Sequence, residues 1–250
     1  MSSGTSPTIR KADRVADDLL RRIVSGAIDV GSLLPKEAEL ASHYEVNRSV
    51  VREAIKLLEV HRLVRPIRRR GTEVLDPMGS VSPEVLRAMI VPAPGSVNVT
   101  LFGDFLEVRA ELDVQMSVLA AQRRTDEDLA ALDVHLAKLA TVLNDRDLYE
   151  RETNALVRTM GRATQNRVFQ MLVWWNQEVA TDLADIFRTV RPANGPHLDG
   201  LHLLVNLVRQ QEAESIRTLV TAFHEWATPR LLAAAALSTG QPLSEIMKGL

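Results

Sequence analysis

Arginines gather in two places near the N-terminus, and their spacing is typical of contact with a polyanion. Arg48 and Arg52 are four residues apart, so a helix places both on one face. Three more arginines follow at positions 68–70, in a turn-rich segment. A guanidinium binds guanine through O6 and N7, or a phosphate, with two parallel hydrogen bonds. Either cluster alone has a plain alternative as solvated surface, but together they indicate nucleic-acid binding.

The elements around these arginines have the order of a winged helix. Val15, Leu19 and Ile23 recur at spacings of four and predict a helix over 12–25, which Gly26 ends. The further elements expected are helices over 35–43 and 47–61 and short strands over 63–67 and 72–75. A helix, a helix-turn-helix and a basic two-stranded wing together predict a winged-helix DNA-binding domain.

The pattern within 35–61 supports the helix-turn-helix. Small Ala41 permits two helices to cross closely. The other side chains expected to face the interior are Leu40, Tyr44, Val46, Val51 and Ala54. By contrast Asn47, Arg48, Ser49 and Arg52 keep the N-terminal end of the second helix polar. That end meets base edges in this motif, so we expect these four residues and wing arginines Arg68, Arg69 and Arg70 to bind DNA.

Composition points to a folded, mainly helical protein. Of 250 residues, 46% are hydrophobic and 25% charged, while aromatic residues make up only 4%. Apolar positions filled by Leu, Ala and Val favour helices over sheets. The absence of cysteine excludes disulfides, thiol nucleophiles and Cys-ligated zinc. The longest apolar stretch, 231–237, is too short to span a membrane and the N-terminus lacks a signal-peptide core, so we expect a cytoplasmic protein without a membrane partner.

A change in charge balance and a turn-rich segment indicate a domain boundary after residue 76. Residues 1–76 hold 14 Lys and Arg against 11 Asp and Glu, and the remainder holds 16 against 21. Helices are expected over 82–91, 100–123, 126–143, 147–163, 166–190, 198–211, 212–236 and 242–249. The predicted organisation is a flexible tail (1–11), a winged-helix domain (12–76), a linker with a connecting helix (77–98), an all-helical effector-binding and dimerisation domain (99–240) and a C-terminal tail (241–250).

Residues 12–75 resemble the GntR family of bacterial transcription regulators. The resemblance is carried by Ile28-Asp-Val-Gly31-Ser-Leu-Leu34-Pro35-Lys-Glu37-Ala-Glu39-Leu40-Ala41, by Val46-Asn-Arg48-Ser-Val-Val-Arg52-Glu53-Ala54 and by Gly71-Thr72. Ala38 replaces a DNA-contacting arginine of the family, so Lys36 or the wing is expected to compensate. Glu45 replaces the usual turn glycine, which implies strain if its φ is positive.

Residues 82–236 resemble the ligand-sensing domain of the FadR subfamily. Its markers are Glu107-Val-Arg109-Ala-Glu-Leu112-Asp113, Ala120-Ala121, Ala163-Thr-Gln-Asn166, and His202 with His224. Many members hold a divalent metal through an Asp and a His four residues apart and two later histidines 22 apart. His202 and His224 keep the later spacing, whereas Thr153 and Val157 stand where the first two ligands belong. We therefore expect no metal and no cofactor.

The resemblance also implies an effector pocket in the helical domain. We expect Arg109, Thr153, Val157, His202 and His224 to border it. Arg109 is expected to bind a ligand carboxylate or, alternatively, to form an ion pair with a nearby acid such as Asp113. The apolar replacements favour a long-chain acyl-coenzyme A or a fatty acid as effector. The function predicted is a homodimeric, ligand-responsive regulator, not an enzyme, that binds a palindromic operator in double-stranded DNA.

Three alternatives stay open. The first is a metal- or carboxylate-sensing regulator of the same subfamily. The second is an enzyme built on the helical bundle around His202 and His224, although we find no complete ligand set or base–nucleophile pair. The third is an architectural DNA-binding protein without effector control.

Overall fold

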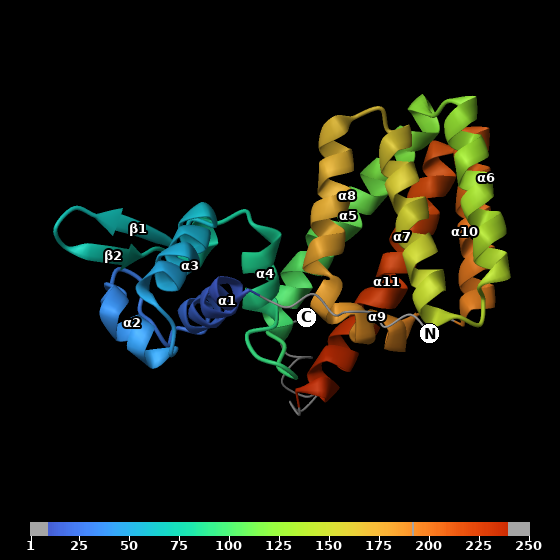
Figure 1. Ribbon diagram of the computed structural model, residues 1–250. Coiled ribbons are helices and arrows are strands. Elements are labelled where there is room, and N and C mark those ends of the chain that lie inside the picture. Colours follow the sequence, from blue (N-terminus) through green and yellow to red (C-terminus); the bar gives the residue numbers. More distant parts are fainter. Residues whose placement is uncertain (1–9, 192, 240–250) are drawn as a thin grey trace, which may run out of the picture. The chain divides into compact units, whose positions relative to one another are not determined.

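The computed structural model describes residues 10–191 and 193–239, which belong to two compact units with their boundary in the chain between Pro94 and Gly95. It confirms a mainly helical chain with an N-terminal winged helix and a C-terminal helical domain (Figure 1). The helix expected over 242–249, the C-terminal tail and most of the N-terminal tail lie outside the described residues.

The first unit is a three-helix core with a hairpin. Its elements are α1 (Lys11–Val24), α2 (Glu37–His43), α3 (Arg48–Val60), β1 (Val64–Ile67), β2 (Gly71–Val74), η1 (Pro77–Gly79) and α4 (Pro83–Ile90). The strands pair antiparallel with Val64 opposite Val74 and Ile67 opposite Gly71, and Leu33 adds a bridge to Glu73. The hairpin therefore projects from the end of α3 and leaves its arginine-rich turn free of the core (Figure 1).

Apolar faces of α1, α2 and α3 build the core of this unit. Leu19, Leu58 and Leu63 are fully buried at its centre. At the edge, the Tyr44 hydroxyl donates to Asp18 over 2.5 Å and so ties α2 to α1. Burial, reinforced by Asp18, raises the pKa of Tyr44 to about 12.

Helix α4 packs into the same core. Val85 and Ala88 are buried among the side chains of the first unit. The Arg21 guanidinium of α1 donates to the carbonyl of Val91, just beyond α4, over 2.9 Å. The segment that the sequence assigned to a linker and connecting helix thus contributes to the winged-helix unit.

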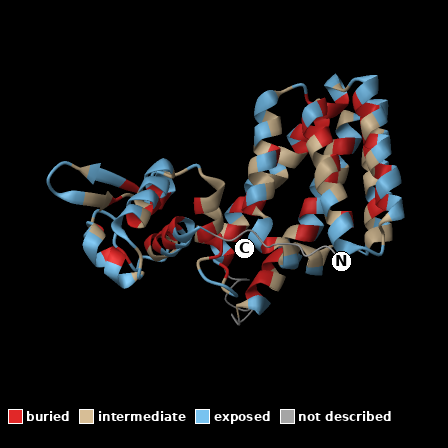
Figure 2. Cartoon of the chain, in the orientation of Figure 1, coloured by how far each residue is buried: buried red, intermediate tan, exposed pale blue. Residues whose placement is uncertain are grey.

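The second unit consists of helices. They are α5 (Val99–Arg123), α6 (Asp126–Thr141), α7 (Arg146–Ala163), α8 (Arg167–Val179), η2 (Thr181–Leu183), α9 (Ala184–Val190), α10 (Asn194–Gln210) and α11 (Ala213–Ser238). Their buried residues face one another along the bundle, with Leu132, Leu139, Tyr149 and Ile216 fully enclosed (Figure 2). At Gly161 of α7, a Cβ atom would come within 3.0 Å of Val173, so this glycine permits the close approach of α8.

Two helix predictions for this unit are corrected. The helix expected over 166–190 is broken at η2, where the chain turns and buries Leu183. No proline or glycine marks this break. The helix expected from 198 begins four residues earlier, at Asn194, because Pro196 falls within the first turn, where a missing N–H costs nothing.

Thr125 is the N-cap residue of α6. Its hydroxyl accepts from Asp128 N, and the Asp128 carboxylate accepts from Thr125 N. Although burial alone would raise it, the hydrogen bonds from Thr125 and Arg162 hold the pKa of Asp128 below its usual range. None of the helices in the described ranges combines the length and the apolar composition that crossing a membrane requires.

Candidate functional site

The turn between α2 and α3 holds the two helices at a close crossing. Ala41 and Ala54 are buried, and Val46 N donates to the Ala41 carbonyl over 3.0 Å to close the turn. Glu45 adopts a φ of 53° in this turn, the left-handed conformation expected from its place in the motif. Small side chains at the crossing thus fix the direction in which α3 leaves the core.

The N-terminal end of α3 is capped by its own polar residues. Asn47 Oδ1 accepts from Val50 N over 3.0 Å and from the Ser49 hydroxyl over 2.8 Å. Both side chains are exposed. Asn47 and Ser49, predicted to contact DNA, therefore also form the cap that starts this helix.

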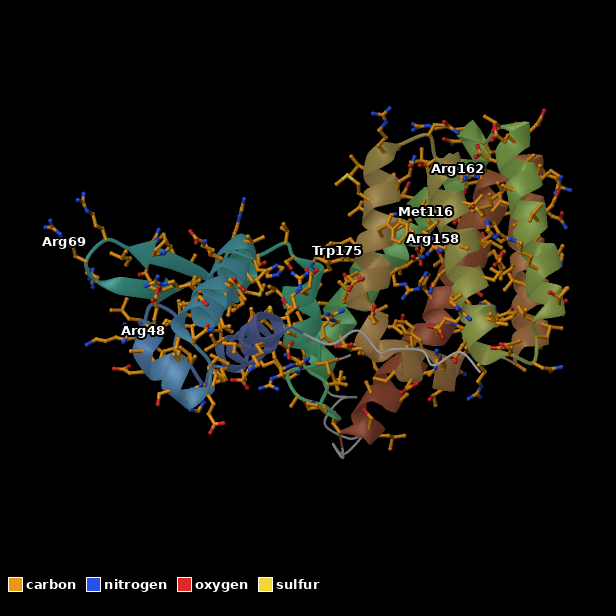
Figure 3. All side chains as sticks on the ribbon, in the orientation of Figure 1. Arg48, Arg69, Met116, Arg158, Arg162 and Trp175 are labelled. Carbon is orange, nitrogen blue, oxygen red and sulfur yellow. The ribbon has the colours of Figure 1, made fainter. Side chains whose placement is uncertain are left out.

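The arginines of α3 share one exposed face but differ in their partners. Arg52 Nε donates to Glu37 Oε2 over 2.8 Å. Arg48, one turn earlier, forms no hydrogen bond or ion pair through its side chain within residues 10–191 and 193–239, and it points away from the unit (Figure 3). Lys36, the N-cap residue of α2, is also exposed.

The wing carries the second basic group at its tip. Arg68, Arg69 and Arg70 are exposed between β1 and β2, and Arg69 projects outward (Figure 3). Arg69 adopts a φ of 63° at the turn. Arg65 is instead paired across the strands with Glu73 at 2.7 Å. The structure therefore places the predicted DNA-binding arginines on the outer face of α3 and on the turn of the wing.

The second unit contains a cavity of about 400 Å³ among α5, α7, α8 and α9. Met116, Phe169 and Val173 provide an apolar part of the wall, and Met116 lies between the helices (Figure 3). The polar side chains that line it are Arg109, Asp113, Glu150, Asn154, Asn176, Gln177, Thr181, Arg188 and Arg191. The lining of the cavity thus combines apolar side chains with three arginines.

The three arginines of the cavity are compensated to different degrees. Arg188 is paired with Glu150 at 2.6 Å, Asp147 at 3.0 Å and Asp185 at 3.6 Å. Arg191 forms no hydrogen bond or ion pair through its side chain with any described residue, and burial lowers its pKa although Glu150 acts in the opposite direction. Arg191 is therefore a partly desolvated cation that pairs directly with no carboxylate among the described residues, although Glu150 acts on it from further away.

Arg109 links the cavity to α11 through one carboxylate. Its Nε lies 3.6 Å from Asp113 Oδ2, and its guanidinium stacks on the Phe187 ring at 4.8 Å. His224, a buried residue of α11, places Nε2 3.2 Å from the same Asp113 oxygen. Asp113 thus lines the cavity and also contacts the buried His224 of α11.

Only part of the predicted pocket assembles around this cavity. Arg109 and Val157 line it, and His224 lies one contact behind its wall. Thr153 does not line it and donates to the Tyr149 carbonyl over 2.9 Å, while His202 is exposed on α10. The sequence interpretation missed Asn176, Arg188 and Arg191, whose only signal was two arginines three residues apart at the end of a predicted helix.

The residues at the subfamily's metal position do not fit a divalent ion. Thr153 and Val157 supply neither a carboxylate nor an imidazole, and His202 and His224 do not meet in one place. Within the described ranges, no three His, Cys, Asp or Glu side chains are grouped as metal ligands.

Comparison with known proteins agrees with both units. The family model "Bacterial regulatory proteins, gntR family" matches residues 11–74, and the FCD domain matches residues 104–225. An uncharacterized HTH-type transcriptional regulator of Mycobacterium tuberculosis is 30% identical over 207 residues, which cover 76% of this chain and 81% of that protein. The galactonate operon transcriptional repressor of Escherichia coli is 28% identical over 167 residues, 66% of this chain and 72% of the repressor.

A solved structure shows that the fold has a precedent over nearly the whole chain. The structure described as "Lar controls the expression of the Listeria monocytogenes agr system and mediates virulence" has a TM-score of 0.61 at 15% identity, covering 91% of this chain and 98% of that one. The family is one of transcription regulators and not of enzymes. Since a relative at 30% identity is covered over most of its length and both family models match in order, the chain belongs to the GntR family of bacterial regulatory proteins, with an FCD domain.

Proposed function

We propose that this protein is a transcription regulator whose first unit binds a specific DNA duplex and whose helical unit binds a small hydroxy acid. The proposal includes a homodimer on a palindromic operator, action in the cytoplasm, a place in the FadR subfamily and no structural metal. A dimer with two-fold symmetry on a palindromic operator makes twice the base contacts of a single winged-helix unit, which supports the dimer.

Arg191 is the observation that carries the choice of effector. Its guanidinium lines the cavity without a direct hydrogen bond or ion pair among the described residues, and burial lowers its pKa although Glu150 acts in the opposite direction. A carboxylate beside it would supply two charge-assisted hydrogen bonds and offset the cost of removing the cation from water. Arg109 lines the same cavity and adds a second positive charge.

Asn176 indicates what else the effector carries. Its Oδ1 atom is buried at the cavity and accepts no hydrogen bond in the described part of the chain. An unsatisfied buried acceptor is costly, so a ligand hydroxyl that donates to it would be favoured. A carboxylate with hydroxyls is the chemistry of a sugar acid, and the galactonate operon repressor is among the relatives of this chain.

The same walls make a long-chain lipid a weaker candidate. The sequence favoured acyl-coenzyme A or a fatty acid because Val157 replaces a polar ligand, and Val157 does line the cavity. However, the volume of about 400 Å³ is near the lower end for small-molecule sites, and many of the lining side chains are polar. An extended acyl chain would leave those polar groups unpaired, so we rank a hydroxy acid first.

Thermal unfolding of the full chain with single ligands tests the proposal. We expect galactonate or gluconate to stabilise the protein, by about 2.7 kcal/mol at a hundred times the dissociation constant, and neutral galactose to have no effect. Arg191→Gln should abolish the stabilisation. Arg167→Gln, which removes an exposed arginine away from the cavity, should retain it.

Other outcomes would contradict specific parts of the proposal. Stabilisation by palmitoyl-coenzyme A but by no hydroxy acid would overturn the effector class. An acid response that survives Arg191→Gln would overturn the binding mode. A melting temperature that falls after dialysis against EDTA and recovers with one equivalent of zinc would overturn the absence of a metal.

A further inference from the structure

Glu37 and Arg52 form an ion pair on the face of the first unit that carries the DNA-reading helix. Arg52 Nε donates to Glu37 Oε2 over 2.8 Å, and the two side chains remain 64% and 38% exposed. Glu37 is the first residue of α2 and Arg52 lies in the second turn of α3, so the pair spans the helix-turn-helix. An acid beside a DNA-reading arginine repels the phosphate backbone, and its presence there requires an explanation.

The pair contributes little to the fold. An ion pair this exposed is among the weakest stabilising interactions in proteins. The start of α2 does not need Glu37 either, because the Glu39 carboxylate accepts from Lys36 N over 3.1 Å there. Neither the stability of the fold nor the start of α2 therefore explains why Glu37 lies beside Arg52.

The geometry fixes Arg52 while leaving its recognition edge open. Glu37 engages only Nε, and the Arg52 side chain has no other hydrogen bond or ion pair within the described ranges. An arginine carries five N–H donors, so its two terminal NH₂ groups stay available. Those are groups that can bind O6 and N7 of a guanine. Arg48 has no such partner among the described residues, so no ion pair there restricts its rotamers.

We propose that Glu37 is a positioning residue for DNA specificity, which orients Arg52 toward a guanine and raises the cost of binding other sequences. On a matching site, Arg52 is already in the geometry for a base contact, so less side-chain freedom is lost on binding. On a non-matching duplex no base contact compensates for the negative charge of Glu37. The inference rests on the proposed binding of specific DNA by the first unit.

Fluorescence anisotropy with the full chain tests this inference. The measured quantity is the ratio of affinities for a duplex selected from a random pool and for a random duplex of equal length. Glu37→Gln should lower this ratio by about tenfold, with tighter binding to the random duplex. Glu53→Gln removes the same charge beside Arg52 in α3, where Glu53 is exposed and unpaired among the described residues, and should change the ratio less than about twofold.

A double-variant cycle separates positioning from charge alone. In an Arg52→Ala background, Glu37→Gln should no longer change the ratio. An unchanged ratio in Glu37→Gln, or an equal fall in the Arg52→Ala background, would overturn the inference and leave the proposed function standing. A wild-type protein that prefers no selected duplex would overturn both. Circular dichroism of each variant confirms that it is folded, and Glu37→Asp offers a second variant that keeps the charge but shortens its reach.

Discussion

Arg48 and Arg69 are both exposed arginines of the first unit, yet their backbones differ in kind. Arg48 is the first residue of α3 and belongs to a capped helix. Arg69 lies in the turn between β1 and β2 and has a positive φ. A residue on a helix end enters the major groove at a fixed depth, whereas a turn follows the phosphate backbone. We therefore assign base reading to Arg48 and phosphate contact to Arg69.

Alanine at each position should produce a different signature. Arg48→Ala should cost about 1–3 kcal/mol on the selected duplex and blur preference at one base pair. Arg69→Ala should weaken all duplexes alike and lower the salt slope by about one. Titrations at several salt concentrations distinguish the two, and identical slopes and specificity losses for both variants would refute the assignment.

His197 provides a prediction on pH. Its Nδ1 lies 2.9 Å from the Tyr149 hydroxyl, and burial, together with the charge of Arg191, lowers its pKa from 6.5 to about 4. The folded protein thus keeps His197 neutral while the unfolded chain binds a proton, so stability is lost as pH falls from 6.5 to 4, by up to about 3 kcal/mol. Urea unfolding across this range should show a shallower loss for His197→Gln. Parallel curves for variant and wild type would contradict this account.

At the scale of elements, periodicity predicted the helices well and their interruptions poorly. The apolar stripe at Val15, Leu19 and Ile23 and the cap at Asn47 locate α1 and α3 to within a residue or two. The break at η2 carries no proline or glycine and follows from burial of Leu183, a tertiary effect that local sequence does not encode. His202 was placed by resemblance alone, and a spacing of 22 says nothing about how deeply a side chain is buried.

In the turn before α3, Glu45 has the positive φ under which the sequence predicts strain. Glu45 has a φ of 53°, a conformation that costs a non-glycine residue about 1 kcal/mol or more. Glu45→Gly should therefore raise the free energy of unfolding by up to about 1 kcal/mol, and β-branched Glu45→Val should lower it. Urea denaturation of the full chain measures both, with Glu53→Gln as a control for the lost charge. A glycine variant less stable than wild type would show that the conformation is not strained.

On the scale of the whole molecule, the oligomeric state is the main prediction. Large apolar side chains stay exposed on the helical unit, notably Met171, Trp174 and Phe223. Exposed apolar area of this kind is often covered by a partner, and a palindromic operator calls for two reading heads. Light scattering of the full chain should give twice the 27.7 kDa chain mass at micromolar concentration. A single-chain mass under these conditions would contradict the dimer.

The place of α4 determines where this protein can be cut and rejoined. A hybrid regulator that takes residues 1–76 as its DNA-binding module would leave behind Val85 and Ala88, which complete the core of that module. Burial of one valine is worth about 1.5–3 kcal/mol, a large share of the stability of so small a unit. The module to transfer is therefore residues 1–94. Hybrids joined at residue 94 should be expressed in folded form and unfold cooperatively on heating, whereas hybrids joined at residue 76 should not.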